Sequence, residues 1–128
     1  GLFTVKELRE QVVMLYSGRN AEAVLAEKNG EDLGVTTGAS NDIEKATGII
    51  KKMITEYGMN ENFGLLNLEE LEIKPDVIAK EAVSLSKELC SESYNLMMDN
   101  ADTLKKIAEA LIEKETLTGE EIRKIAGK

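Results

Sequence analysis

Residues 40–58, SNDIEKATGIIKKMITEYG, carry the clearest helical period in the chain. Apolar side chains recur there every three or four residues, which places them on one face of an α-helix. Ser40 or Asn41 is suited to cap the start of this helix, and Gly58 is suited to end it. The apolar stripe consists of Ile43, Ala46, Ile50, Met53 and Tyr57.

The residues upstream predict one or two further helices. Thr4 and Glu7 have the spacing of a capping box, and an apolar stripe follows them. We expect Gly18 to interrupt this helix, so that residues 19–27 form a second helix or a kinked continuation that stops at Asn29 and Gly30. The first stripe consists of Val5, Leu8, Val12, Leu15 and Tyr16, and the second of Ala21, Val24 and Leu25.

Three more helices are predicted downstream. Pro75, the only proline, fits the first turn of a long helix that ends near Met98. Residues 102–114 form the next helix, and a capping box at Thr118 and Glu121 starts a short last one. Residues 62–72 are either a short strand or an irregular segment over the core. The residues expected to face inward are Ile78, Ala82, Leu85, Leu89, Leu96, Leu104, Ile107, Ala108, Leu111, Ile122 and Ile125.

Together these patterns predict an all-α fold, an antiparallel bundle of about five or six helices. Only 4% of the 128 residues are aromatic and none is Trp, so the core must be built from aliphatic side chains. No linker or repeat divides the chain, and we therefore expect residues 1–128 to form a single helical domain.

The composition excludes several classes of function. The chain has no His and one Cys, so it cannot by itself form a Ser-His-Asp triad, a His-based zinc centre or an internal disulfide. Its net charge of −8 disfavours phosphate backbones and anionic lipids, so we expect no nucleic-acid partner and no membrane contact. It lacks a signal-peptide pattern and an apolar run of about 20 residues, so the chain as written is expected to be soluble and cytoplasmic.

Residues 28–40 predict a long loop that leads into the central helix. Asp42, in the first turn of that helix, is favoured there by the helix dipole alone, whatever its function. Residues 34–38 could instead form an anion-binding loop before the helix. This interpretation has little support, because the loop lacks the Lys of a P-loop and Asp42 would repel an anion. Cys90 is expected to be a small buried apolar residue rather than a reactive thiol.

Several segments resemble one known family. VTTGASNDIEKAT at residues 35–47 and MITEYGM at residues 53–59 closely resemble the peptidase domain of FtsH, a membrane-anchored AAA+ zinc metalloprotease. GRNAE at residues 18–22 and LIEKETLTGEEI at residues 111–122 are similar to two further runs of that family. Three ordered matches, at residues 18–22, 35–59 and 111–122, are far more specific than a single capping box or glycine loop.

The resemblance implies a metal site to which this chain contributes one ligand. In that family, zinc is held by two His of a helical His-Glu-x-x-His motif and by the Asp of a Gly-Ala-x-Asn-Asp segment, which falls here on Asp42. The motif helix lies upstream of the residues that resemble Thr4 to Glu22, and it is absent from this chain. We therefore expect no catalytic residue and no bound cofactor in this chain alone, although the complete family enzyme contains zinc.

Two hypotheses follow. In the first, the chain is a fragment or truncated relative of an ATP-dependent zinc metalloendopeptidase, inert alone, whose complete form works on the cytoplasmic side of a membrane with an ATPase module and protein substrates. In the second, it is a non-catalytic helical interaction module derived from that fold, for which a homo-oligomer is one expected state.

The chain also departs from the family next to the cleft. Ala23 replaces an acidic residue usual in the family. The stretch between the Gly-Arg run and Val35, which carries residues 26–32, is longer than expected, and the stretch between Met59 and Pro75 is shorter than in typical members.

Overall fold

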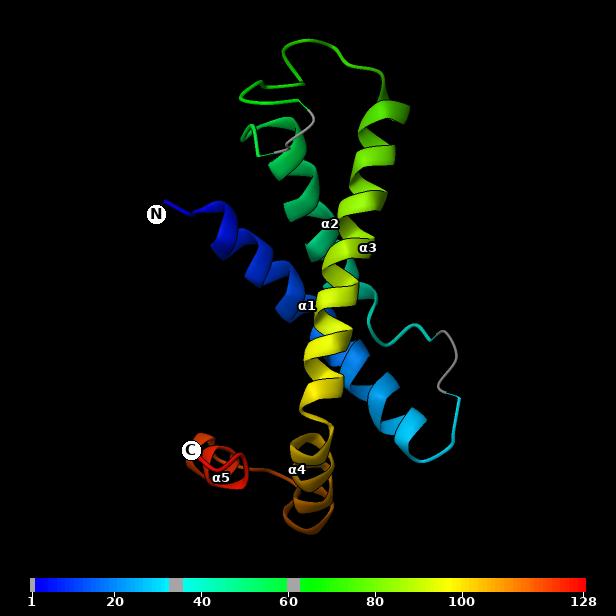
Figure 1. Ribbon diagram of the computed structural model, residues 1–128, viewed down its shortest axis with the longest axis vertical. Coiled ribbons are helices and arrows are strands. Elements are labelled where there is room, and N and C mark those ends of the chain that lie inside the picture. The colour runs from blue at the N-terminus through cyan, green and yellow to red at the C-terminus, as the bar shows by residue number, and fades with distance from the viewer. Residues whose placement is uncertain (1, 33–35, 60–62) are drawn as a thin grey trace.

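The computed structural model describes residues 2–32, 36–59 and 63–128, and in them the chain is all-α (Figure 1). The described residues contain helices but no strand, which confirms the predicted fold class. The helices are α1 (Val5–Lys28), α2 (Ser40–Thr55), α3 (Pro75–Asp99), α4 (Ala101–Lys114) and α5 (Gly119–Ile125).

The core lies where α1, α2 and α3 meet, and we call these three helices the core layer. All three pack against one another; α2 runs beside one half of α3, and α1 crosses α3 near its middle (Figure 1). Aliphatic side chains fill the junction, as the low aromatic content requires. The buried cluster consists of Val12, Tyr16, Ala46, Ile50, Ile54, Leu68 and Leu89.

Helix α1 is continuous through Gly18, so the predicted interruption at this residue is wrong. A glycine inside a helix costs only about 1 kcal/mol relative to alanine, and burial on both sides of it offsets that cost. Tyr16 and Asn20, which flank Gly18, are both buried against the rest of the layer. The predicted capping box is confirmed, because Thr4 Oγ1 accepts a 3.1 Å hydrogen bond from the Glu7 amide.

Helix α2 starts without a side-chain cap, so the prediction that Ser40 or Asn41 caps it is wrong. The N-cap is Ala39, and the turn before it is closed by the Ser40 amide, which donates to the Thr37 carbonyl at 3.1 Å. Ile43 and Tyr57, at the ends of the predicted stripe, are about half exposed because the neighbouring helices cover only its middle.

Gly58 follows α2 with a φ of 63°, as its predicted role at the helix end requires. A Cβ at this position would lie 3.0 Å from the Cα of Leu65, which approaches as the chain turns back. In the connector that follows, Leu68 is 1% exposed, and its amide donates to the Thr55 carbonyl at 2.7 Å. Described residues 63–72 form turns and no strand, so the irregular alternative of the prediction is the correct one.

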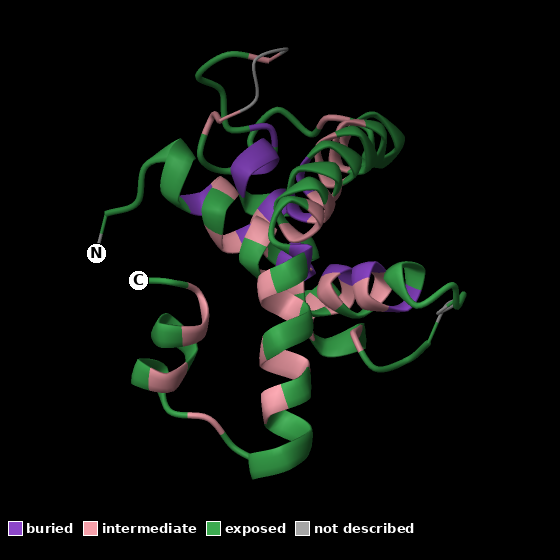
Figure 2. Ribbon diagram, turned by 60° about the horizontal axis from the view of Figure 1, so that its bottom comes forward, coloured by how far each residue is buried: buried purple, intermediate pink, exposed green. Residues whose placement is uncertain are grey.

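Helices α4 and α5 form an arm at the end of α3. Figure 2 shows that buried residues gather in the core layer, whereas the arm is mostly exposed or half-buried. Ala101 is the only residue of α4 that is buried. The predicted inward positions Leu111 and Ile122 are exposed, and so is Leu96 near the end of α3, because the core layer does not extend far enough to cover them.

A polar seam joins α1 to α3 within the core layer. The hydroxyls of Tyr16 and Ser86 share a 2.8 Å hydrogen bond. Asn20 Nδ2 donates to the Cys90 carbonyl at 3.3 Å, and Cys90 itself is half-buried. Ser93 is fully buried, and its hydroxyl lies 3.2 Å from that of Ser17. These bonds fix the position of α1 along α3, because any slip would leave buried polar groups without partners.

Candidate functional site

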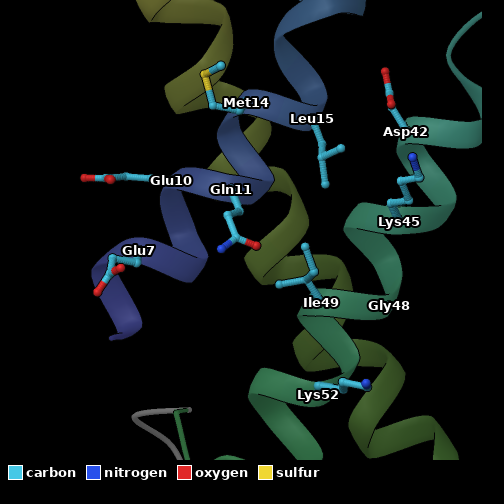
Figure 3. Close-up of a pocket in the computed structure, with 10 residues that line it drawn as sticks. All are labelled: Glu7, Glu10, Gln11, Met14, Leu15, Asp42, Lys45, Gly48, Ile49 and Lys52. Carbon is cyan, nitrogen blue, oxygen red and sulfur yellow. The ribbon is translucent and has the colours of Figure 1, made fainter. Parts of the chain in front are cut away.

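A groove of about 900 Å³ lies between α1 and α2 (Figure 3). It is open to solvent along one side and runs over about two and a half turns of each helix. The residues that line it recur at helical intervals on both elements: Glu7, Glu10, Gln11, Met14, Leu15, Asp42, Lys45, Gly48, Ile49 and Lys52.

The floor of the groove is apolar. Leu15 on α1 and Ile49 on α2 are half-buried and pack against the core cluster. Met14 is 69% exposed, although it is a large apolar side chain in the middle of a helix. Its thioether is flexible and adapts to many partner surfaces. The groove therefore exposes apolar surface that nothing in the described residues covers.

The two rims of the groove carry opposite charges. Glu7 and Glu10 extend from α1 on one side, and Lys45 and Lys52 extend from α2 on the other (Figure 3). The Glu7 carboxylate also accepts a 3.3 Å hydrogen bond from the Thr4 amide, within the capping box. The groove thus combines an apolar floor with an acidic edge on α1 and, on α2, an edge that carries two lysines and ends at Asp42.

Asp42, the one site residue predicted from the sequence, lies at one end of this groove. It is half-buried and lies in the first turn of α2, where free amide groups and the helix dipole favour a carboxylate. The loop before it is ordered near its end by the Gly38 amide, which donates to Thr36 Oγ1 at 3.4 Å. Of residues 34–38, the segment considered for anion binding, positions 34 and 35 lie outside the described residues.

The described residues do not assemble a metal site by themselves. In residues 2–32, 36–59 and 63–128, no three Cys, Asp or Glu side chains lie close enough to hold an ion. Asp42 offers a carboxylate oxygen, which is a normal zinc ligand, but catalytic zinc needs three protein ligands. Zinc therefore fits this chain only if the other ligands come from elsewhere, and no reaction step can be assigned to these residues alone.

The family resemblance of the sequence singled out Asp42, but no sequence pattern predicted the groove around it. The rim residues stand at the polar edges of two apolar stripes, where charged side chains normally face water. Only the crossing of α1 and α2 brings them together. Gly48 is the one signal that was available, because a glycine in the middle of a helix weakens it and needs a reason.

No helix in the described part of the chain is both long and apolar enough to cross a membrane.

Comparison with known proteins adds a family assignment to this geometry. Residues 1–125 match the sequence model of peptidase family M41. The chain is 37% identical to the ATP-dependent zinc metalloprotease FtsH 1 of Thermoanaerobacter sp. (strain X514), over 93% of this chain and 21% of that protein. It is 36% identical to the ATP-dependent zinc metalloprotease FtsH of Rubrobacter xylanophilus, over 93% of this chain and 20% of that protein. It is 31% identical to the ATP-dependent zinc metalloprotease FtsH 4 of Synechocystis sp., over 98% of this chain and 22% of that protein. The chain thus spans about a fifth of the length of these relatives.

Proposed function

This chain belongs to peptidase family M41, and we propose that residues 1–128 form a single helical domain, the later part of the peptidase domain of an ATP-dependent zinc metalloendopeptidase. In this proposal, Asp42 is the third protein ligand of the zinc. The two His ligands come from a His-Glu-x-x-His helix outside these residues.

The position of Asp42 is the observation that carries this proposal. Its carboxylate lies beside an open groove, at the start of a helix held by the core layer. A ligand on a rigid element keeps its geometry when the metal binds. The groove leaves room beside Asp42 for a further element that brings the missing ligands.

Zinc held by three protein ligands lowers the pKa of a bound water to about 7 and so supplies the nucleophile for peptide hydrolysis. This chain's own part is to hold one ligand in place and to form one wall of the site. The complete enzyme would hydrolyse protein substrates that its ATPase module delivers, beside the cytoplasmic face of a membrane. The 128 residues alone would be inert. They contain no His to bind the zinc, and the His-Glu-x-x-His motif, whose Glu acts as the general base, is absent from them.

Two experiments test this proposal. An immunoblot of source cells with an antibody against this chain should show a band several times larger than 14.1 kDa. The polypeptide in that band should cleave casein in the presence of ATP and zinc, whereas the purified 128-residue chain should not. Zinc-dependent cleavage by the 128-residue chain alone would contradict its predicted inertness.

The exposed Met14 and the open groove favour a second function, that of a non-catalytic helical interaction module. Such a protein would exist as a free 14.1 kDa chain and would use the groove for association. A band at that size, together with self-association in solution and no zinc uptake, would favour this second function over the first.

A further inference from the structure

We propose that α5 is a hinged cover on α4, held closed by the ion pair between Lys114 and Glu121 against the strain of a turn at Glu115. When the ion pair breaks, the turn relaxes and α5 leaves α4 as one unit, which uncovers the apolar side of α4. This device lies wholly within the arm and involves neither zinc nor Asp42, so it does not rest on the proposed function.

The turn after α4 is strained. The Glu115 amide still donates a helical hydrogen bond to the Leu111 carbonyl, at 2.8 Å. The next amide, that of Thr116, donates instead to the Lys114 carbonyl two residues back, at 2.7 Å. Glu115, between them, has a φ of 65° and a ψ of −37°. A γ-turn with a positive φ at its centre is rare and strained, because the Cβ of the central residue crowds the backbone.

Other helix ends in this chain avoid such strain with glycine. Gly30, Gly58 and Gly127 follow α1, α2 and α5, and each has a positive φ. Glycine adopts this conformation without a steric clash because it has no Cβ. The end of α4 carries a glutamate in the same region of φ, and its side chain is exposed. Packing around this side chain therefore does not force the conformation, and neighbouring residues must hold it.

Helix α5 is only lightly attached to the molecule. It packs against α4 and against no other helix of the described chain. None of its residues is buried, and Ile122 is 38% exposed. Leu117, Ile125 and Ala126 are half-buried. So small an apolar contact holds α5 weakly, and elements of this kind are the first to open in a folded protein.

Glu121 supplies the latch. One of its carboxylate oxygens accepts a 3.3 Å hydrogen bond from the Thr118 amide, within the capping box of α5. The other accepts a 2.6 Å hydrogen bond from the ammonium group of Lys114, the residue directly before the strained turn. This ion pair therefore closes a ring around Glu115 and holds α5 against the end of α4. The two side chains are 61% and 35% exposed, so salt screens their attraction.

The strain is tested by amide hydrogen exchange of the 128-residue chain, followed by NMR. Glu115→Gly should slow exchange of the α5 amides about fivefold, because glycine removes the strain of the closed state. Glu113→Gly removes the same side chain from the last turn of α4, where φ is helical. It is the matched control and should speed exchange instead, because glycine weakens a helix.

The latch has its own readout. Glu121→Gln keeps the capping box, since glutamine also serves at this position, but it removes the ion pair. It should speed exchange of the α5 amides severalfold, whereas Glu120→Gln should leave exchange unchanged. Raising the NaCl concentration to about 1 M should also speed exchange in the unaltered chain, but not in Glu121→Gln. Adding Glu115→Gly to Glu121→Gln should restore slow exchange, because strain and ion pair act on the same equilibrium.

If α5 leaves as a unit, the amides of Ile122 to Ala126 should share one opening constant. Three results would overturn the inference. These are faster exchange in Glu115→Gly, exchange that becomes steadily faster toward the end of α5, and exchange that is independent of salt. None of these readouts uses zinc or proteolysis, so a failure of this inference is distinguishable from a failure of the proposed function.

Discussion

Helices α2 and α4 have equally clear apolar stripes, yet they are buried to very different extents. Five residues of α2 are buried: Ala46, Ile50, Met53, Ile54 and Thr55. In α4 only Ala101 is buried, and Leu111 is 40% exposed. The difference lies in their neighbours, because α2 packs extensively against both α1 and α3, whereas α4 lies at the end of α3 and touches α1 and α3 over a few residues only (Figure 1).

The comparison shows that periodicity identifies the apolar face of a helix but does not determine how much of it is covered. Coverage depends on which elements the topology brings alongside, and this is a property of the whole chain. Stability should therefore be concentrated in the core layer, and the arm of α4 and α5 should open first.

The largest expected contrast comes from truncating one apolar side chain in each region. Ile50→Ala should lower the free energy of unfolding by about 2–5 kcal/mol, because Ile50 is 2% exposed and its loss leaves a cavity. Leu111→Ala should cost less, about 1 kcal/mol, because 40% of Leu111 stays exposed to water and its loss leaves no closed cavity. Urea unfolding followed by circular dichroism measures both. Equal losses would contradict the division into core layer and arm.

The polar seam should have the next largest effect. Asn20→Ala should lower the free energy of unfolding by about 1–2 kcal/mol, since it removes the bond to the Cys90 carbonyl from a buried interface. Asn95→Ala, on an exposed position of α3, is the matched control and should change stability by less than about 0.5 kcal/mol. If both variants unfold at the same urea concentration, the seam does not stabilise the layer.

Two glycines of the core layer should respond in opposite directions. Gly18→Ala should raise the free energy of unfolding by about 0.5–1 kcal/mol, because it lies inside α1 with open space for a Cβ. Gly58→Ala should lower it, because its φ is 63° and a Cβ would press on Leu65. Thermal unfolding of both variants gives the sign. Destabilisation by Gly18→Ala would mean that α1 is not continuous at this residue.

The smallest expected effect is a local one, at the end of the arm. The Lys114 ammonium, which donates a 2.6 Å hydrogen bond to Glu121, is the main reason that the pKa of Glu121 lies below its ordinary value of 4.5; the Thr118 amide adds to it. Because the folded-state pKa is the lower one, the stabilisation is present above about pH 4.5 and is lost as the pH falls through the lowered value.

We therefore expect the amide resonances of α5 to shift toward random-coil values below about pH 4.5, before those of the core layer, in NMR spectra recorded against pH. Glu121→Gln should remove this dependence while Glu120→Gln preserves it, since Glu120 does not bond to Lys114 in the described structure. Simultaneous loss of both regions would mean that the arm does not open independently.

The sequence predicted the helices better than it predicted how they pack. The capping boxes at Thr4 and Thr118 and the stop at Gly58 were correct, because each depends on a few neighbouring residues. The break at Gly18 and the cap at Ser40 or Asn41 were wrong, because tertiary packing outweighed local preference in the first case and a turn replaced the side-chain cap in the second. The burial of Leu96, Leu111 and Ile122 was also wrong.

The candidate site was predictable only in part. The metal-ligand role of Asp42 was predicted only from the resemblance to a family. A carboxylate in the first turn of a helix is common without any function, because the helix dipole favours it. The groove beside it was not predictable, because residues such as Glu10 and Lys45 are far apart in the sequence and each alone resembles a solvated surface charge. They form a site only when α1 and α2 pack together.

The most direct test of the central claim is the zinc content of the complete polypeptide that contains these residues, measured by mass spectrometry after dialysis. We expect about one zinc per polypeptide, most of it lost in Asp42→Asn and retained in Asp76→Asn. Asp76 is the matched control because it occupies the first turn of α3 as Asp42 occupies that of α2. Equal zinc in both variants, or none in the unaltered polypeptide, would contradict the assignment of Asp42 as a metal ligand.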